Sequence, residues 1–313
     1  MAAGRRPKTM RLRILGSAAG GGFPQWNCNC RNCDGVRSGR IRATARTQSS
    51  IAVRGDGADW LLINASPDLL AQIRANPPLQ PARRPRDTGI AAVLLTDGQV
   101  DHVTGLAMLR EHRRPLPVWC TDAVAEDLGR GYPLFGMLGH YCGVERHPVP
   151  LDGRAFPISG VDGLAFTAVP VASKAAPYSP HREAPQRGDN IAVLIEDASG
   201  RTAFYAPGLA AIDEVTWDAM RRADVVLVDG TFWHDEEMIA LGFSRKRARD
   251  IGHLPQSGPD GMIAWLDRLP AATRRVLIHV NNTNPILDED SAERAELARH
   301  GIEVAADGQE LEP

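Results

Sequence analysis

The sequence contains no long apolar run, since no stretch of its 313 residues approaches the roughly 20 apolar residues that cross a bilayer. It also lacks a charge excess: the net charge of −2 gives no electrostatic reason to expect nucleic acid or a membrane as a partner. Cysteine is scarce and odd in number, with three of the five within six positions. Such a cluster argues against a disulfide framework and for a reducing compartment, so we expect a cytoplasmic protein.

The chain reads as one domain with a short extension. Residues 1–9 are basic but precede no apolar segment of the kind found in secretory signals, so they predict a disordered extension. Hydrophobic content of 43% and charged content of 24% are typical of a globular protein. No linker divides the rest, and we expect a single domain over residues 10–313.

Two strand-rich halves alternate with helices. Runs of branched and aliphatic residues predict strands at 10–17, 49–54, 60–64, 90–96, 117–120, 164–171, 190–195, 201–205, 224–228 and 274–279. Helical spacing predicts helices at 66–76, 103–113, from 122 onward, and at 210–222, 255–268 and 288–299. The order predicts an α/β protein, an αββα four-layer sandwich of two sheets covered by helices.

Three segments between these elements carry local signals. Ser66 and Pro67 predict the cap and first residue of the helix at 66–76. The Pro- and Arg-rich loop at 77–87 is interpreted as a solvated surface, and residues 129–159 as an insertion packed over one edge.

The cysteine cluster is the first candidate for chemistry. Cys28, Cys30 and Cys33 form a C-x-C-x-x-C pattern after a glycine-rich stretch. Three close thiolates repel one another unless a metal shares them, which favours structural zinc with a fourth ligand from elsewhere in the chain. Free or redox-active thiols are the alternative. Cys120 and Cys142 lack partner spacing and are interpreted as small core residues.

Acidic residues and histidines follow three of the predicted strands. Asp101 and His102 end the loop after the strand at 90–96, Asp229 follows the strand at 224–228, and His279 ends the strand at 274–279. Charges at the ends of buried strands must be paired or ligated, so together these residues predict a metal site. For Asp101 and His102 alone, a helix cap and a surface histidine are the alternative.

Two further segments have open interpretations. His253 precedes a predicted helix, where it serves either as a helix-start residue or as a catalytic group. The polar run at 173–182 is either a surface turn or a source of substrate-binding groups.

The 16–30 opening, the 97–102 loop and the 279–285 run together resemble the metallo-β-lactamase superfamily, in the branch that contains RNase Z. Within it, the chain is similar to the family of B proteins of pyrroloquinoline quinone (PQQ) biosynthesis. The resemblance implies the metallo-β-lactamase fold and a structural zinc at the three clustered cysteines. For the fourth zinc ligand, Asn282 and His234 are the candidates.

The resemblance also implies that one of two active-site metal pockets is lost. The first pocket normally takes histidines, but here its positions are Asp97, Gln99 and Ser173, so we expect it to be empty. The positions of the second are Asp101, His102, Asp229 and His279. Two histidines with a carboxylate and open positions suit non-haem Fe(II), so we expect iron there, with Asp229 ligating or orienting a ligand.

The implied function is O2-dependent hydroxylation of the tyrosine ring in a Glu–Tyr cross-linked fragment of a precursor peptide, during PQQ synthesis. Asp97, Gln99 and His253 would position substrate or move protons. The expected substrate contacts are Ser173, Lys174, Tyr178 and Asn281. Other enzymes of the pathway and a second copy of the chain are the macromolecular partners considered.

Two other functions stay open. One is a carrier without catalysis that assists transport of PQQ or its precursor to the periplasm. The other is a metallohydrolase of phosphodiesterase or peptidase type, which would need a second metal in the first pocket.

Overall fold

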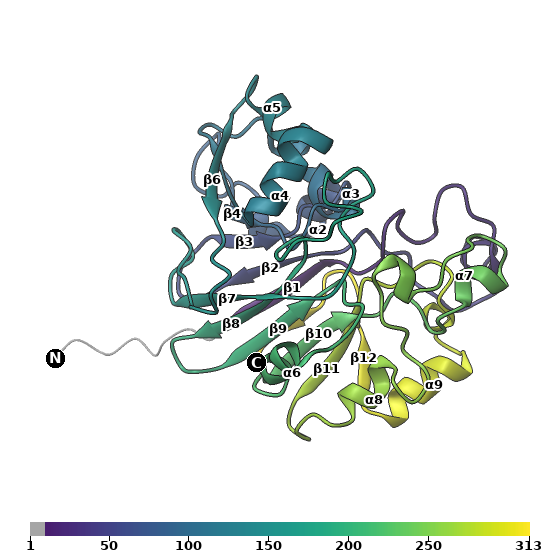
Figure 1. Cartoon of the computed structure of the whole chain (residues 1–313). Helices are drawn as coiled ribbons and strands as arrows, with labels where there is room; N and C mark the ends of the chain where they lie inside the picture. Colours follow the sequence, from purple (N-terminus) through teal and green to yellow (C-terminus); the bar gives the residue numbers. More distant parts are fainter. Residues whose placement is uncertain (1–9) are drawn as a thin grey trace.

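Two mixed β-sheets pack face to face in the computed structural model, which describes residues 10–313 (Figure 1). The extension expected at residues 1–9 lies outside the described residues. The first sheet has seven strands, in the spatial order β13 (Glu310–Leu311), β1 (Arg11–Gly16), β2 (Ser50–Arg54), β3 (Trp60–Ile63), β4 (Ile90–Leu94), β5 (Leu116–Cys120) and β6 (Val144–Pro148).

The second sheet has six strands, in the order β12 (Ile302–Val304), β11 (Arg274–Ile278), β10 (Val225–Asp229), β9 (Thr202–Ala206), β8 (Ile191–Asp197) and β7 (Leu164–Pro170). Strands β9 to β12 run parallel, whereas β7, β8 and β9 are antiparallel neighbours. The parallel part matters for function, because it brings the carboxyl ends of β10 and β11 to one edge of the sheet.

The main core lies between the sheets, where alternate residues such as Leu12, Ile63, Phe166 and Ile278 are fully buried. The outer face of the first sheet packs on α2 (Leu69–Ala75), α4 (Asp122–Glu126) and α5 (Leu134–Leu138) (Figure 1). The second sheet is covered by α6 (Glu214–Met220), α8 (Met262–Leu266) and α9 (Ala292–Arg299). The predicted four-layer sandwich is confirmed.

The remaining helices lie in the connections. They are α1 (Arg31–Ser38), α3 (Val100–Val103), α7 (Glu237–Ala240), the 3₁₀ turns η1 (Pro77–Leu79), η2 (Thr104–Leu109), η4 (Arg249–Ile251) and η5 (Pro285–Leu287), and a π-type turn η3 (Asp127–Gly131). The helix expected at 103–113 is instead the succession of α3 and η2. The expected insertion at 129–159 supplies α5 and the edge strand β6.

The predicted helix start at Ser66 is wrong. Helix α2 begins at Leu69 after Asp68, and the buried Ser66 hydroxyl has no hydrogen-bond partner. Two other helices start later than predicted because true capping residues set their first turns. Asp213 accepts a hydrogen bond from the Thr216 N–H before α6, and Ser291 caps α9 in the same way.

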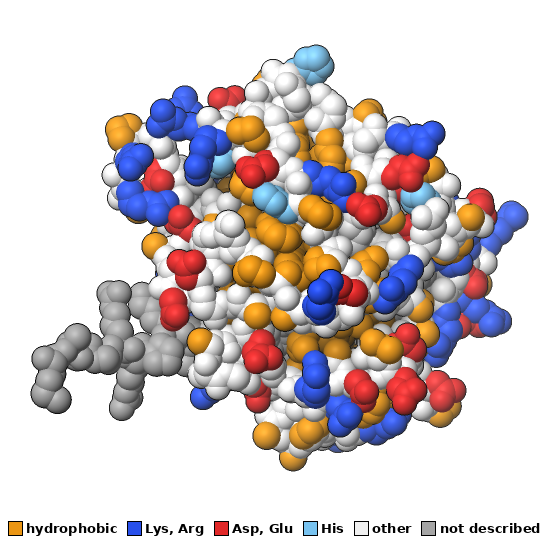
Figure 2. All heavy atoms as spheres, turned by 60° about the vertical axis from the view of Figure 1, so that its left-hand side comes forward, with side chains coloured by type: hydrophobic (Ala, Val, Ile, Leu, Met, Phe, Trp, Pro, Cys, Tyr) orange, Lys and Arg blue, Asp and Glu red, His pale blue; other side chains and the backbone are white. Residues whose placement is uncertain are grey.

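The surface is mixed in character. Figure 2 shows a face on which apolar side chains run down the middle while basic side chains gather at the upper left, with a few acidic ones among them. Within residues 10–313, no helix combines the length and apolar character that crossing a bilayer requires.

Candidate metal centre and its cavity

The candidate centre lies where loops from the two sheets meet. Asp101 and His102 belong to α3, which follows β4 in the first sheet, and His279 comes directly after β11 in the second. His279 adopts a left-handed backbone with φ of 61°, a conformation that residues other than glycine rarely adopt. Such local strain is retained where the surrounding structure fixes a functional side chain.

Asp101, His102 and His279 converge on one point. The Asp101 Oδ2 atom lies 3.1 Å from His279 Nε2 and 3.7 Å from His102 Nε2. Ligand atoms from all three lie within 4.8 Å of one another. The buried His102 Nε2 has no hydrogen-bond partner, which is costly unless it binds something. These residues therefore fit a metal ion held by two imidazoles and one carboxylate.

Asp97 fixes the orientation of His102. Both Asp97 carboxylate oxygens lie 2.8 Å from His102 Nδ1, so the proton on that nitrogen faces Asp97 and Nε2 faces the centre. Burial opposes charge on the ring, but Asp97 and Asp101 outweigh it and raise the pKa of His102 to about 9. Asp97 also accepts hydrogen bonds from the Gln99 N–H and the Thr96 hydroxyl, so it acts as a positioning group.

Asp229 lies next to the centre and is linked to His279 through Thr231. Its carboxylate accepts hydrogen bonds from the Leu209 N–H at 2.9 Å, the Thr231 N–H at 2.9 Å and the Thr231 hydroxyl at 2.6 Å, and it lies 2.6 Å from His253 Nδ1. The Thr231 hydroxyl is in turn 2.8 Å from His279 Nδ1. Of the two roles expected for Asp229, this geometry favours orientation of a ligand over direct ligation.

His253 lies beside His279 at the wall of the cavity. The two rings stack with centroids 5.5 Å apart, and Asp229, His253 and His279 also offer ligand atoms within 4.8 Å of one another. Burial lowers the pKa of His253, but the paired Asp229 outweighs burial and raises it above the usual value. His253 does not start a helix, because η4 ends before it and α8 begins well after it.

The positions of the first pocket carry no imidazole. Gln99 Nε2 donates to the Lys174 carbonyl at 3.0 Å, and the Ser173 hydroxyl donates to the Gly252 carbonyl at 2.9 Å. Gly208, which follows β9, lies close to Ser173, since a Cβ at this glycine would be 3.7 Å from Ser173 Oγ. This side of the centre is open space lined by amide and hydroxyl groups.

A cavity of about 770 Å³ opens over the centre. Of the expected substrate contacts, Ser173 and Asn281 line it, whereas Lys174 and Tyr178 do not. The Tyr178 hydroxyl instead donates to the Gly98 carbonyl and so supports the loop at 97–102, which we call the metal loop.

Sequence reasoning missed part of the cavity wall. Phe232, Phe243 and Lys246 line it together with Arg182, the last residue of the polar run at 173–182. Phe243 and Lys246 follow α7, which lies beside the N-terminal loop in Figure 1. No local pattern marks these residues, because only the packing of two distant loops brings them to the cavity.

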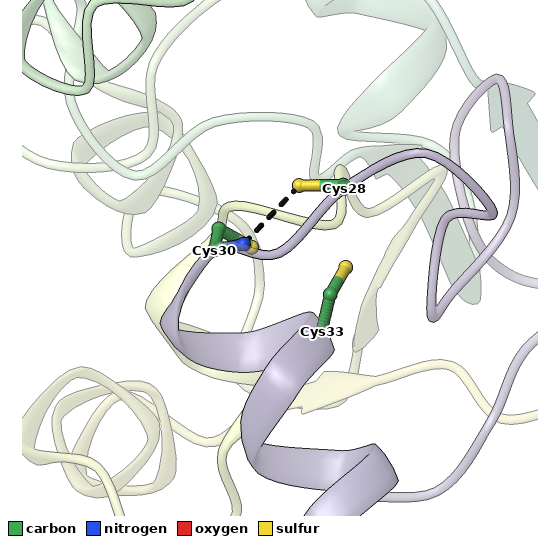
Figure 3. Close-up of side chains that lie close together, drawn as sticks. All are labelled: Cys28, Cys30 and Cys33. Carbon is green, nitrogen blue, oxygen red and sulfur yellow. Dashed lines mark hydrogen bonds between the residues drawn. The ribbon is translucent and has the colours of Figure 1, made fainter.

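The cysteine cluster lies beside the cavity, whose lining includes Cys28. Figure 3 shows the three cysteine side chains close together. The sulfur atoms of Cys28, Cys30 and Cys33 lie within 4.8 Å of one another, at the start of α1. Zinc–sulfur bonds of about 2.3 Å in a tetrahedron require separations of this order, so the three thiols fit a zinc ion. Burial raises the pKa of Cys30 to about 11, so a metal would have to displace its proton.

Asn282 faces the three thiols. Its Nδ2 atom lies 3.0 Å from Cys28 Sγ, 3.7 Å from Cys30 Sγ and 3.4 Å from Cys33 Sγ. His234 is exposed and lies 2.9 Å from the Ser257 hydroxyl through its Nδ1 atom. Of the two candidates for the fourth zinc ligand, the geometry favours Asn282. Its amide oxygen would face the thiols if the side-chain amide group were flipped.

Comparison with known proteins defines the class. A family model described as "Beta-lactamase superfamily domain" matches residues 59–280. A crystal structure of a diphosphatase of the PhnP family has a TM-score of 0.67 at 20% identity over 98% of both chains, a likeness that concerns the fold alone. The chain is thus a β-lactamase superfamily protein with the metallo-β-lactamase fold.

Closer relatives define the family. Coenzyme PQQ synthesis protein B of Azoarcus sp. strain BH72 is 64% identical over 303 residues, covering 96% of this chain and 99% of the relative. The crystal structure of Zn²⁺-bound PqqB from Methylobacterium extorquens has a TM-score of 0.88 at 39% identity, covering 97% of this chain and 100% of that one. The chain belongs to the coenzyme PQQ synthesis protein B family.

Proposed function

We propose that this chain is a mononuclear metal-dependent hydroxylase of PQQ synthesis. Iron(II) would be held by Asp101, His102 and His279, and a phenol ring of a small peptide-derived substrate would lie in the cavity. The reaction would use O2 and a two-electron reductant: one oxygen atom replaces a ring hydrogen and the other leaves as water.

One observation carries this proposal: Asp101, His102 and His279 offer two imidazoles and a carboxylate within 4.8 Å of one another, and the buried Nε2 atom of His102 has no hydrogen-bond partner. Such a set leaves coordination positions for O2 and substrate, and bound iron would supply the redox chemistry. The positions that would hold a second metal carry Asp97, Gln99 and Ser173. Since Asp97 is already committed to His102, a two-metal clamp for hydrolysis is disfavoured.

The chain's own residues would handle substrate and protons. His253 lines the cavity and is paired with Asp229, so it would exchange a proton with the phenol or with O2-derived oxygen. Arg182 and Lys246 bring positive charge to the same cavity and would pair with carboxylates of a Glu–Tyr cross-linked substrate. Asn281 and Ser173 would add neutral contacts.

The test is metal content and oxidation by protein prepared without oxygen and loaded with Fe(II). The variant is His279→Asn, since asparagine tolerates a left-handed backbone. The matched control is His140→Asn, at an exposed histidine far along the chain from the centre. We expect one zinc and one iron in the parent, with O2-dependent addition of oxygen to the substrate ring. His279→Asn should lose iron and turnover while keeping zinc.

Three results would contradict the proposal. Two coupled metals with phosphodiester or peptide cleavage would indicate a hydrolase. Tight binding of PQQ or a precursor without iron uptake would indicate a carrier. Full turnover by His279→Asn would exclude the centre described above.

A further inference from the structure

A second cavity, separate from the metal centre, lies between two exposed segments of the first-sheet side. It has a volume of about 770 Å³ and is lined by residues 83–84, 86–88, 108–109 and 111–114. Five of these residues are arginines, namely Arg83, Arg84, Arg86, Arg113 and Arg114, and His112 also lines the cavity. We call this cavity the arginine groove.

Arg83 stabilises one wall of the groove through two ion pairs. The Arg83 guanidinium pairs with Asp87 at 2.9 Å and with Asp59 at 2.9 Å. These hydrogen bonds hold the pKa of Asp87 well below its usual value. The two carboxylates therefore fix the 83–88 loop, and Arg83 is not available to a ligand.

The other four guanidinium groups are free. Within residues 10–313, the side chains of Arg84, Arg86, Arg113 and Arg114 have no hydrogen bond, ion pair or ring contact, and all four residues are exposed. Five arginines face two carboxylates, Asp87 and Glu111, so the lining has an excess of three positive charges. The chain as a whole has a net charge of −2. Positive charge is thus concentrated here against the overall sign, as at surfaces that attract an anionic partner.

We propose that the arginine groove is a docking site for an acidic segment of a partner protein. Guanidinium groups bind carboxylates through paired hydrogen bonds, and two facing segments suit several carboxylates spaced along one peptide. Met108 and Leu109 add partly buried apolar surface for a side chain between the acidic ones. The groove is lined by no Phe, Tyr or Trp on which a base could stack, which disfavours single-stranded nucleic acid.

This site is independent of the proposed hydroxylase chemistry. One wall of the groove belongs to the basic loop at 77–87, interpreted from the sequence as solvated surface. The other wall is formed by the end of η2 and the residues after it, and η2 directly follows α3, the helix that contains His102. The linings of the two cavities share no residue, so binding in the groove can be disrupted by substitutions that leave the lining of the metal-centre cavity intact.

The test is fluorescence anisotropy with the full chain and a labelled octapeptide of glutamates interrupted by two leucines. The matched probe replaces each glutamate with glutamine, and the competitors are a short DNA duplex and vesicles containing phosphatidylserine. We expect the acidic peptide to bind with an affinity that falls as salt rises, and the glutamine peptide not to bind.

The test variant is the double charge reversal Arg84→Glu with Arg113→Glu. Its control, Arg222→Glu with Arg299→Glu, makes the same charge change at exposed arginines whose side chains have no hydrogen bond, ion pair or ring contact in the described chain. The groove variant should weaken peptide binding at least about tenfold and the control by less than about twofold, with melting temperatures unchanged in both. Equal weakening by both variants, absence of peptide binding, or binding of DNA or vesicles in place of the peptide would overturn the proposal.

Discussion

The two candidate metal clusters differ in how they are built. The cysteine cluster takes three soft ligands from six consecutive positions, and an amide from a neighbouring loop closes its fourth side. The Asp101–His102–His279 centre takes nitrogen and oxygen ligands from both sheets and opens on a large cavity. A closed sulfur site contributes stability, whereas an open site with free positions contributes chemistry.

One turn serves both clusters. His279 belongs to the open centre and Asn282, three residues later, faces the thiols. The turn is fixed by backbone hydrogen bonds from the Val280 N–H to the Ser17 carbonyl and from the Asn281 N–H to the Thr231 carbonyl. The cysteine cluster thus lies behind the turn at 279–282. Substitutions can disrupt one cluster while the metal content of the other is measured.

The largest effect is expected from His102→Ala. Iron content should fall from about one per chain to about zero, because two ligands cannot replace the removed imidazole and Asp97 loses its partner. Zinc content should stay at that of the parent. Elemental analysis after Fe(II) loading measures both metals, and retention of iron by this variant would show that the open centre is elsewhere.

The second change, Cys30→Ser, disrupts the cysteine cluster instead of the open centre. Removing one thiolate opens the closed shell, so zinc should be lost and the free energy of unfolding should fall by about 3 kcal/mol or more. The control is Cys142→Ser, since that cysteine lies outside the cluster. Chemical denaturation with parallel zinc analysis checks the result, and an unchanged stability with full zinc would remove the structural-zinc interpretation.

A smaller effect is expected from Asp97→Asn. The amide keeps the size of the carboxylate but loses the charge that orients the His102 proton, so iron affinity should fall about 10- to 100-fold while zinc is unaffected. Competition with an Fe(II) chelator measures the change. An unchanged affinity would mean that Asp97 does not position His102.

The smallest effect concerns Asp127, which lies behind the metal loop and belongs to neither cluster. Both of its carboxylate oxygens are buried, and burial raises its pKa. A raised pKa in the folded state means that the stability contribution is present while the group is protonated and is lost as pH rises through that pKa. Asp127→Asn should therefore stabilise the protein by about 1 to 3 kcal/mol at neutral pH and by less in acid.

Melting temperatures across the pH range test this expectation, with Asp260→Asn as an exposed control. A gain that is equal at all pH values would show that the charge on Asp127 is not the cause.

Local patterns revealed the fold and the strongest ligands. The strand at 274–279 and the cysteine spacing could be read directly, because burial imposes apolar runs and zinc imposes close thiols. The helix start at Ser66 could not, since Asp68 and the Gln48 groups it accepts hydrogen bonds from lie on different segments. Lys174 and Tyr178 were expected in the cavity, but their backbone and hydroxyl contacts support the metal loop instead.

The sequence by itself determined the layered fold, the three thiols and the residues Asp101, His102 and His279 at the strand ends. Only the tertiary structure decided that Asp97 orients His102, that Asp229 supports His279 through Thr231, and that Asn282 faces the thiols. It also decided that arginines from two separate segments line one groove. Side-chain type and spacing fix which residues can ligate, but partners far apart in the chain meet only when the two sheets pack.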